Sequence, residues 1–258
     1  MIDCRLGELE PYEYKTLFKF ETSYWWFRGL HSILRETLRD AGLRSGLSVL
    51  DAGCGTGQNL ISLNENKHYE IFGFDISTHA ASFWPQRGLD RVCVSSINQI
   101  PFREESFDAV VSVDVLECEA VDEMAAYSEM WRVLKPGGLI ALVVPAYEWL
   151  LSEEHHKAVG ATRRYSKQRL VGLMNTKPVE LIRMTHLFAS VFPLVVAYRV
   201  LQPYWKRSGS DAPRSDLKPL PNLINEILFN IAHIEKRILK HFDLPFGSSI
   251  LALARKAE

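Results

Sequence analysis

Cysteine is scarce in this 258-residue chain, and neither sign of charge dominates. The four cysteines (Cys4, Cys54, Cys93 and Cys118) show no C-x-x-C spacing, which argues against zinc and is typical of a reducing compartment. We interpret them as small packing residues and expect no metal. A net charge of -1 and a sequence pI of about 6.7 give no electrostatic reason to expect a nucleic-acid partner.

The features of a membrane span and of a secretory signal are also missing. The strongly apolar residues 187–200 are interrupted by Pro193 and Arg199, and they fall short of the roughly 20 residues that a spanning helix needs. They are typical instead of a lid or of a segment that enters a membrane interface. Residues 1–5 lack the basic and then apolar layout of a signal peptide, so we expect a cytoplasmic protein.

A glycine-rich stretch after residues 47–51 organises the chain. The apolar run is typical of a buried strand and ends at Asp51, and three glycines then follow at alternate positions, Gly53, Gly55 and Gly57. Glycine permits positive φ angles and lets a ligand approach the main chain. The spacing is G-x-G-x-G rather than the G-x-G-x-x-G of a dinucleotide site. The stretch predicts a nucleotide-type binding loop.

A second acid follows the next expected strand. The expected strand at residues 70–74 is followed directly by Asp75, about 20 residues after the glycines. At this position, doubly wound folds place a carboxylate that accepts hydrogen bonds from ribose hydroxyls. Alternatively, Asp51 is a turn acid and Asp75 is the N-cap of a helix that begins near Ser77. The spacing of the two acids relative to the glycines favours the ligand-binding interpretation.

With these residues the sequence resembles the class I S-adenosylmethionine (SAM) methyltransferases. The resemblance continues at residues 96–102 and 106–108 (family pattern D-x-x-x-L-P-F, then S-F-D), at residues 114–118 (D-x-L-E-H) and at residues 134–138 (L-K-P-G-G). Here Ser96 replaces the usual acid and Cys118 the usual histidine, and Glu117 either binds a ligand or only caps a helix. The resemblance implies SAM as cofactor, with these binding residues: Arg28, Asp51, Gly53, Gly55, Asp75, Ile76, Ser96, Ile97 and Asp114.

The resemblance and the alternation of strands and helices after residue 46 predict an α/β fold. The expected elements include a helix near residues 78–84 and a fifth strand at residues 139–144, which follows a turn at residues 135–138. We expect a doubly wound, Rossmann-like sheet of seven strands, mostly parallel with an antiparallel last strand, plus N-terminal helices and a helical cap insertion. The expected parts are an N-terminal helical lid (1–45), a SAM-binding core (46–186 and 246–258) and the cap (187–245).

The aromatic run at residues 24–27 lies between two expected helices, 12–20 and 25–38. One interpretation is plain core that seals the edge of the sheet. The other is a lid over the cofactor, for which the family resemblance implies an arginine that meets the methionine carboxylate. Arg28 is the candidate for that role.

An insertion at residues 146–165 follows the expected fifth strand, where ligands bind in open α/β sheets. It resembles a bacterial stretch, S-x-H-D-x-x-x-G-H-x-R-R-Y-S, with His156 at the acid and Ala161 at the second histidine. The alternative is a solvated basic loop. The hypothesis assigns catalytic and substrate-binding residues as follows: His155 and His156 as bases, and Tyr147, Arg163, Arg164 and Tyr165 as acceptor contacts.

Residues 221–242 predict an amphipathic helix in the cap, with apolar side chains along one face. Apolar walls near a basic loop favour an acceptor with an apolar body and a polar or anionic head. The sequence therefore predicts a SAM-dependent methyltransferase of a small molecule. The absence of D/N-P-P-Y after the fourth strand argues against nucleic-acid substrates.

Two alternatives stay open: a peripheral membrane methyltransferase of a lipid-linked substrate, and a non-catalytic SAM-binding partner of another protein. The oligomeric state is left open.

Overall fold

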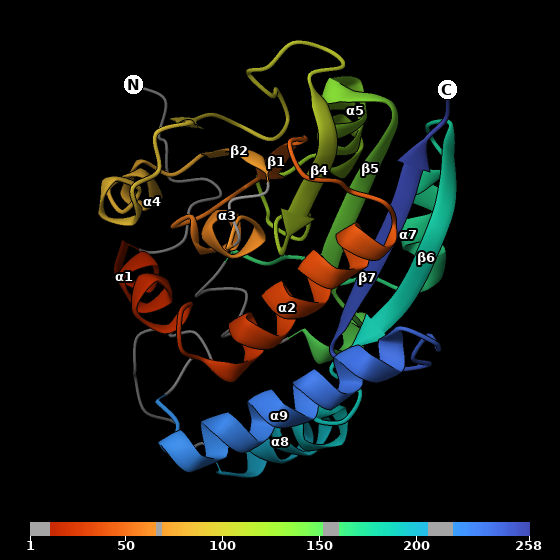
Figure 1. The fold of residues 1–258 in the computed structure, drawn as a ribbon. Helices are drawn as coiled ribbons and strands as arrows, with labels where there is room; N and C mark the ends of the chain where they lie inside the picture. Colours follow the sequence, from red (N-terminus) through yellow and green to blue (C-terminus); the bar gives the residue numbers. More distant parts are fainter. Residues whose placement is uncertain (1–10, 66–68, 152–159, 206–218) are drawn as a thin grey trace.

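The computed structural model describes residues 11–65, 69–151, 160–205 and 219–258. Its centre is a seven-stranded sheet in the order β3-β2-β1-β4-β5-β7-β6 (Figure 1). The strands are β1 (Ser48–Ala52), β2 (Glu70–Asp75), β3 (Val92–Val94), β4 (Phe107–Val113), β5 (Leu134–Pro145), β6 (Val179–Leu187) and β7 (Ser249–Lys256). β1 to β5 pair in parallel, whereas β7 runs antiparallel to both β5 and β6. The predicted fold class is confirmed.

Helices cover both faces of the sheet, α2 and α3 in front and α5 and α7 behind in Figure 1. The helices are α1 (Pro11–Phe20), α2 (Trp25–Asp40), α3 (Gln58–Leu63), α4 (Thr78–Ala81), α5 (Glu123–Val133), α7 (Lys167–Met174), α8 (Phe192–Trp205) and α9 (Asn222–Leu239), with short 3-10 turns at Pro85–Arg87 and Glu148–Leu150. Successive strand residues point to opposite faces. Val49 therefore packs with α2, and Leu50 packs with the core cluster that contains α5 and α7.

Two local expectations were wrong. The K-P-G-G residues, expected as a turn before a strand at 139–144, lie within β5, which begins at Leu134 and shifts register against β4 between Phe107 and Ala109. Gly137 accommodates the irregularity with φ +73°. The helix expected over residues 78–84 ends at Ala81 and is followed by a turn and the 3-10 turn that begins at Pro85.

The apolar stripe of α9 does not face the protein core. Ile227 and Ile234 are 50% and 56% exposed, whereas Ala232 and Glu235 are buried. The small Ala232 side chain allows close contact with α2, where a Cβ built on Gly29 would lie 2.9 Å from the Ala232 Cβ. The carboxylate of Glu235 accepts hydrogen bonds from the amides of Phe188 and Ser190. Helix packing is thus made by the less apolar side of α9.

Candidate active site

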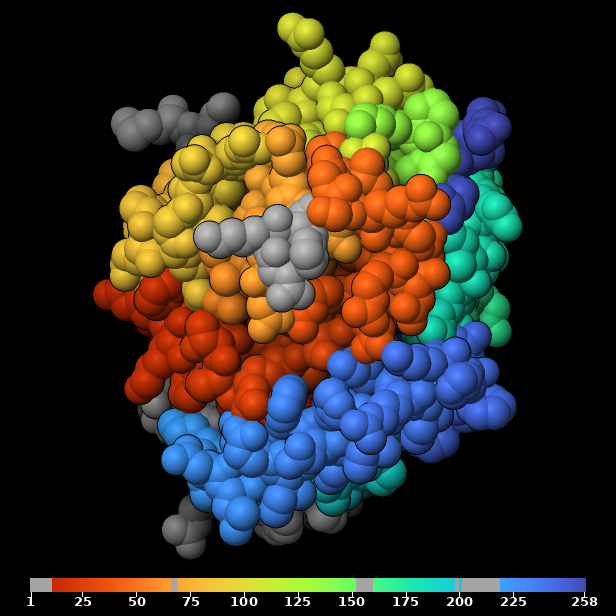
Figure 2. Space-filling model, viewed as in Figure 1, coloured from red at the N-terminus to blue at the C-terminus, as the bar shows by residue number. Residues whose placement is uncertain are grey.

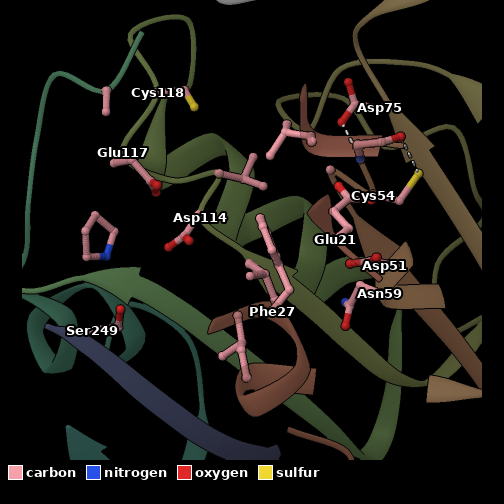
Figure 3. A pocket seen from close by; sticks show the side chains of 18 of the residues that line it. Glu21, Phe27, Asp51, Cys54, Asn59, Asp75, Asp114, Glu117, Cys118 and Ser249 are labelled. Carbon is pink, nitrogen blue, oxygen red and sulfur yellow. Dashed lines mark hydrogen bonds between the residues drawn. The ribbon is translucent and has the colours of Figure 1, made fainter. Parts of the chain in front are cut away.

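A cavity of about 490 Å³ lies beyond the carboxyl ends of β1, β2 and β4. The strand order reverses between β1 and β4, and such switch points are where open α/β sheets bind ligands. Helices α1 and α2 supply one wall through Tyr14, Trp25 and Phe27. In Figure 3, Phe27 lies between two groups of polar side chains, one around Asp51 and Asp75 and the other around Asp114 and Glu117.

The glycine loop after β1 turns tightly beneath the cavity. Gly53 has φ +86°, and a Cβ at this position would lie 2.4 Å from Cγ2 of Val115. Gly55 has φ +52°, and no atom lies within 4 Å of the position that its Cβ would take. Gly53 is therefore required by packing, whereas Gly55 leaves open space through which a ligand can reach the main chain.

Asp75 connects the end of β2 to this loop. Its Oδ2 accepts from the amide of Gly55 at 2.8 Å and its Oδ1 from the amide of Ser77 at 2.9 Å. The N-cap of α4 is Ser77, whose hydroxyl accepts from the amides of His79 and Ala80. The carboxylate of Asp75 also lines the cavity, so the capping interpretation of Asp75 was wrong.

Asp51 is 1% exposed at the end of β1, beside Asn59. Neither carboxylate oxygen has a hydrogen-bond partner among the described residues. Burial raises the pKa of Asp51 to about 7; the neighbouring Asn59 side chain opposes this rise, and the charges of Asp75 and Glu21 add to it. An unpartnered buried carboxylate is costly and is suited to a cationic or hydrogen-bond-donating ligand.

We expect this carboxyl to make the ligand-free protein less stable as the pH rises. The native state holds the Asp51 proton up to about pH 7, whereas the unfolded state releases it near 3.8. The free energy of unfolding should therefore fall between about pH 4 and pH 7, by at most about 1.4 kcal/mol per pH unit from this group. Asp51→Asn should flatten the fall in urea titrations across this range. Equal slopes in the two proteins would contradict the assignment.

The loops after β2 and β3 supply the other predicted nucleotide contacts. Ile76, Ser96 and Ile97 all line the cavity. The hydroxyl of Ser96 accepts from the amide of Asn98 at 3.2 Å and so shapes the turn. The amide of Ile97 donates to no other described residue, which leaves it available to a ligand.

The second polar group lies at the end of β4. Asp114 has φ +50°, a conformation that is uncommon outside glycine and concentrates at functional sites. Burial raises the pKa of both Asp114 and Glu117, and the charge of Asp114 raises that of Glu117 further. Arg164 lines the same end of the cavity and donates to the carbonyl of Ala146 at 3.1 Å. The ionisable side chains of Asp114, Glu117 and Arg164 thus lie at the same end of the cavity. The interpretation of Glu117 as a helix cap is wrong, because the N-cap of α5 is Asp122.

The other three described residues that were expected to contact the acceptor lie outside the cavity lining. Arg163 donates to the carbonyls of Cys118 and Val121, at 2.8 and 2.9 Å. Tyr165 is fully buried, and its hydroxyl contacts the carbonyl of Leu116 and the carboxylate of Glu123. Tyr147 stacks on His186, with ring centroids 5.5 Å apart. None of these three lines the cavity, so the structure gives them a role in holding the loop. His155 and His156 lie outside the described residues.

Arg28 also does not line the cavity. Its guanidinium pairs with Glu226 of α9 and lies 3.7 Å from the centroid of the Phe229 ring. The face of α2 that carries Arg28 is covered by α9, which draws the side chain away from the glycine loop.

Sequence reasoning missed the residues that tie the N-terminal helices to the glycine loop. The buried carboxylate of Glu21 accepts from the hydroxyl of Thr56 and, at 2.9 Å, from Nη2 of Arg87. His31 also lines the cavity, and burial together with Arg35 and Arg87 lowers its pKa to about 4, so that it is neutral. No local pattern marks these residues, because Glu21 and Arg87 are 66 positions apart.

Comparison with known proteins identifies the central part of the chain. Residues 50–142 match the family model of a methyltransferase domain. A sterol 24-C-methyltransferase from Pneumocystis carinii is 35% identical over 129 residues, which cover 45% of this chain and 31% of that protein. A cycloartenol-C-24-methyltransferase from Arabidopsis thaliana is 33% identical over 140 residues, covering 46% and 38%. The chain thus spans about a third of the length of these curated relatives.

Solved structures share the fold well beyond this region. A geranyl diphosphate C-methyltransferase from Streptomyces coelicolor aligns with a TM-score of 0.56 at 18% identity, covering 88% of this chain and 80% of that one. The family match includes the glycine loop, Asp75 and Asp114, which the structure gathers around one cavity. The chain therefore contains a methyltransferase domain, and its fold is similar to that of solved S-adenosylmethionine-dependent methyltransferases.

Proposed function

We propose that the protein transfers a methyl group from SAM to a lipophilic small molecule. The observation that carries the proposal is the cavity itself, which joins a glycine loop with carboxylates at one end to an apolar chamber with polar groups at the other. The family match supports the reaction, and the size of the cavity suits small molecules.

The residues at the glycine-loop end fit SAM. Asp75 offers carboxylate oxygens for ribose hydroxyls, Ile97 a main-chain amide for the adenine, and Gly53 and Gly55 a main chain that a ligand can approach. The unpartnered Asp51 carboxylate provides a negative charge for the amino-acid end. When bound, SAM supplies a methyl group that its sulfonium already activates. The protein's tasks are then to align the acceptor and to exclude water.

The acceptor chamber is largely apolar. Trp25, Phe27, Leu150 and Val195 line it, and they come from α2, the 3-10 turn after β5, and α8. Such walls bind an apolar body and keep water away from the transferring group. The names of the two curated relatives state that they methylate carbon 24 of a sterol or of cycloartenol, which supports a lipophilic acceptor for this chain as well.

Glu117 is the residue that we assign to the polar head of the acceptor. Burial raises the pKa of Glu117, which favours the protonated carboxyl, and a protonated carboxyl can donate a hydrogen bond to an acceptor oxygen. Glu117→Ala should raise the KM for the acceptor about tenfold, the usual cost of a lost buried hydrogen bond. Steady-state kinetics and calorimetric SAM titration would measure this, with Glu117→Gln as the variant that keeps a donor. A weakened SAM affinity with unchanged KM would place Glu117 in the cofactor site instead.

Methyl transfer from labelled SAM into an extract of the native host tests the function itself. We expect label in the organic phase after partition, on a compound that mass analysis shows to be one methylene unit heavier than its precursor. Label confined to polar metabolites would contradict a lipophilic acceptor. Tight SAM binding without any labelled product would favour the non-catalytic alternative.

A further inference from the structure

An apolar surface that no other described element covers runs along the outer side of α9 and the residues just after it. We call it the outer face, and it has these members, with exposed fractions: Leu223 (73%), Ile224 (46%), Ile227 (50%), Ile234 (56%), Ile238 (43%) and Phe242 (70%). Figure 2 shows α9, in blue, crossing the lower surface of the molecule. Scattered exposed apolar residues are ordinary, but an ordered stripe over a whole helix marks an interaction surface.

Packing among the described residues does not account for the outer face. α9 contacts α2 through its opposite side, where Ala232, Glu235 and Leu239 are buried. Lys236 and Lys240 also point to that side and pair with Glu36 of α2. The apolar residues are thus in excess of what holds α9 in place.

A positive charge lies beside the outer face. Arg237 is exposed next to Ile234 and Ile238, and it has no acidic partner in the described part of the chain. His241, which is also exposed, adds a second basic side chain at the same edge. The acids of α9 are already engaged, Glu226 with Arg28 and Glu235 with the amides of Phe188 and Ser190. An apolar stripe edged by unpaired basic side chains is the pattern of a helix that lies in the plane of an anionic lipid surface.

The neighbouring helix connects this surface to the cavity. On α8, the side chains of Leu194 and Val200 are 67% and 57% exposed. Val195, which directly follows Leu194, lines the cavity. In Figure 1, α8 and α9 lie at the same end of the molecule. Adjacent residues of α8 therefore lie at the exposed apolar surface and in the wall of the acceptor chamber.

We propose that the outer face of α9, together with the exposed side of α8, docks on a lipid surface that carries anionic headgroups. No helix in the described ranges is long and apolar enough to cross a membrane, so the contact is interfacial. Lipid docking is a property separate from the proposed methyl transfer. It rests on the proposed function only for its purpose, which is to bring a lipophilic acceptor to the cavity. The acceptor then enters along α8 without crossing bulk water.

Vesicle flotation of the full chain tests the docking. The protein should float with vesicles of phosphatidylcholine and phosphatidylglycerol, and less with phosphatidylcholine alone. The double variant Ile227→Glu/Ile234→Glu should reduce the vesicle-bound fraction by about tenfold or more, because two apolar side chains no longer enter the interface. Arg237→Glu should weaken binding only to the anionic vesicles. Met124→Glu is the matched control, since Met124 is 48% exposed on α5, away from α8 and α9.

Two outcomes would overturn the proposal. Wild-type protein that stays at the bottom of both gradients has no lipid-docking face. A wild-type dimer that the double variant converts to a monomer would show that a second copy of the chain covers the outer face. SAM titration of the same samples, without lipid, separates these results from a failure of the methyltransferase assignment, because flotation requires no turnover.

Discussion

The Asp75→Ala variant is expected to bind SAM about 10- to 100-fold more weakly than the wild type, the cost of losing charge-assisted hydrogen bonds in a partly buried site. Asp75 lines the cavity and also orients the glycine loop through the amide of Gly55. Alanine removes both the ligand contact and this support. Isothermal titration calorimetry with SAM measures the effect directly.

The control for this prediction is Glu180→Ala, which removes an exposed acid from β6 and should leave SAM affinity unchanged. Circular dichroism would verify that both variants are folded. An Asp75→Ala protein that binds SAM as tightly as the wild type would refute the ribose assignment. A variant that fails to fold would be replaced by Asp75→Asn, which keeps one acceptor oxygen and should show a smaller loss.

Alanine substitutions at Gly53 and Gly55 are expected to have different effects, the first on the stability of the fold and the second on SAM affinity. Gly53→Ala places a Cβ 2.4 Å from Cγ2 of Val115 and forces alanine to φ +86°, so the free energy of unfolding should fall by about 2 to 5 kcal/mol. Gly55→Ala meets no atom within 4 Å, so its cost to stability is confined to the strained φ of +52°. Its methyl group occupies the space left for a ligand, and SAM affinity should fall instead.

Urea denaturation and SAM titration of both variants measure the two effects. The double variant Gly53→Ala/Val115→Ala removes the clashing methyl groups and should recover part of the lost stability, leaving the cost of the positive φ. If Gly53→Ala and Gly55→Ala lose stability equally, the contact with Val115 is not what requires glycine at position 53.

Most of the fold was predictable because it depends on local periodicity. The strand expected at residues 47–51 is β1 (Ser48–Ala52), and the helices expected at 12–20 and 25–38 are α1 and α2. Apolar spacing identifies an element whatever its neighbours are. The predictions failed at the L-K-P-G-G residues and after Ala81, where a bulge and a proline decide how the element continues.

Site residues were predictable where a strand end places them. Asp51 and Asp75 lie at the carboxyl ends of β1 and β2, and Asp114 directly follows β4. Parallel strands bring their carboxyl ends together. The directions of other side chains were not predictable. Arg28 turns to Glu226, which is 198 positions away, and Arg163 turns to main-chain carbonyls.

The sequence by itself determined the methyltransferase motifs, the order of strands and helices, and the apolar stripe of α9. Tertiary structure alone decided that this stripe faces outward, that Glu21 joins Arg87 beside the glycine loop, and that Asp114, Glu117 and Arg164 meet at the far end of the cavity. The physical reason is that backbone conformation and periodicity depend on neighbours along the chain. The partner and the burial of a side chain depend instead on which distant segments pack against it.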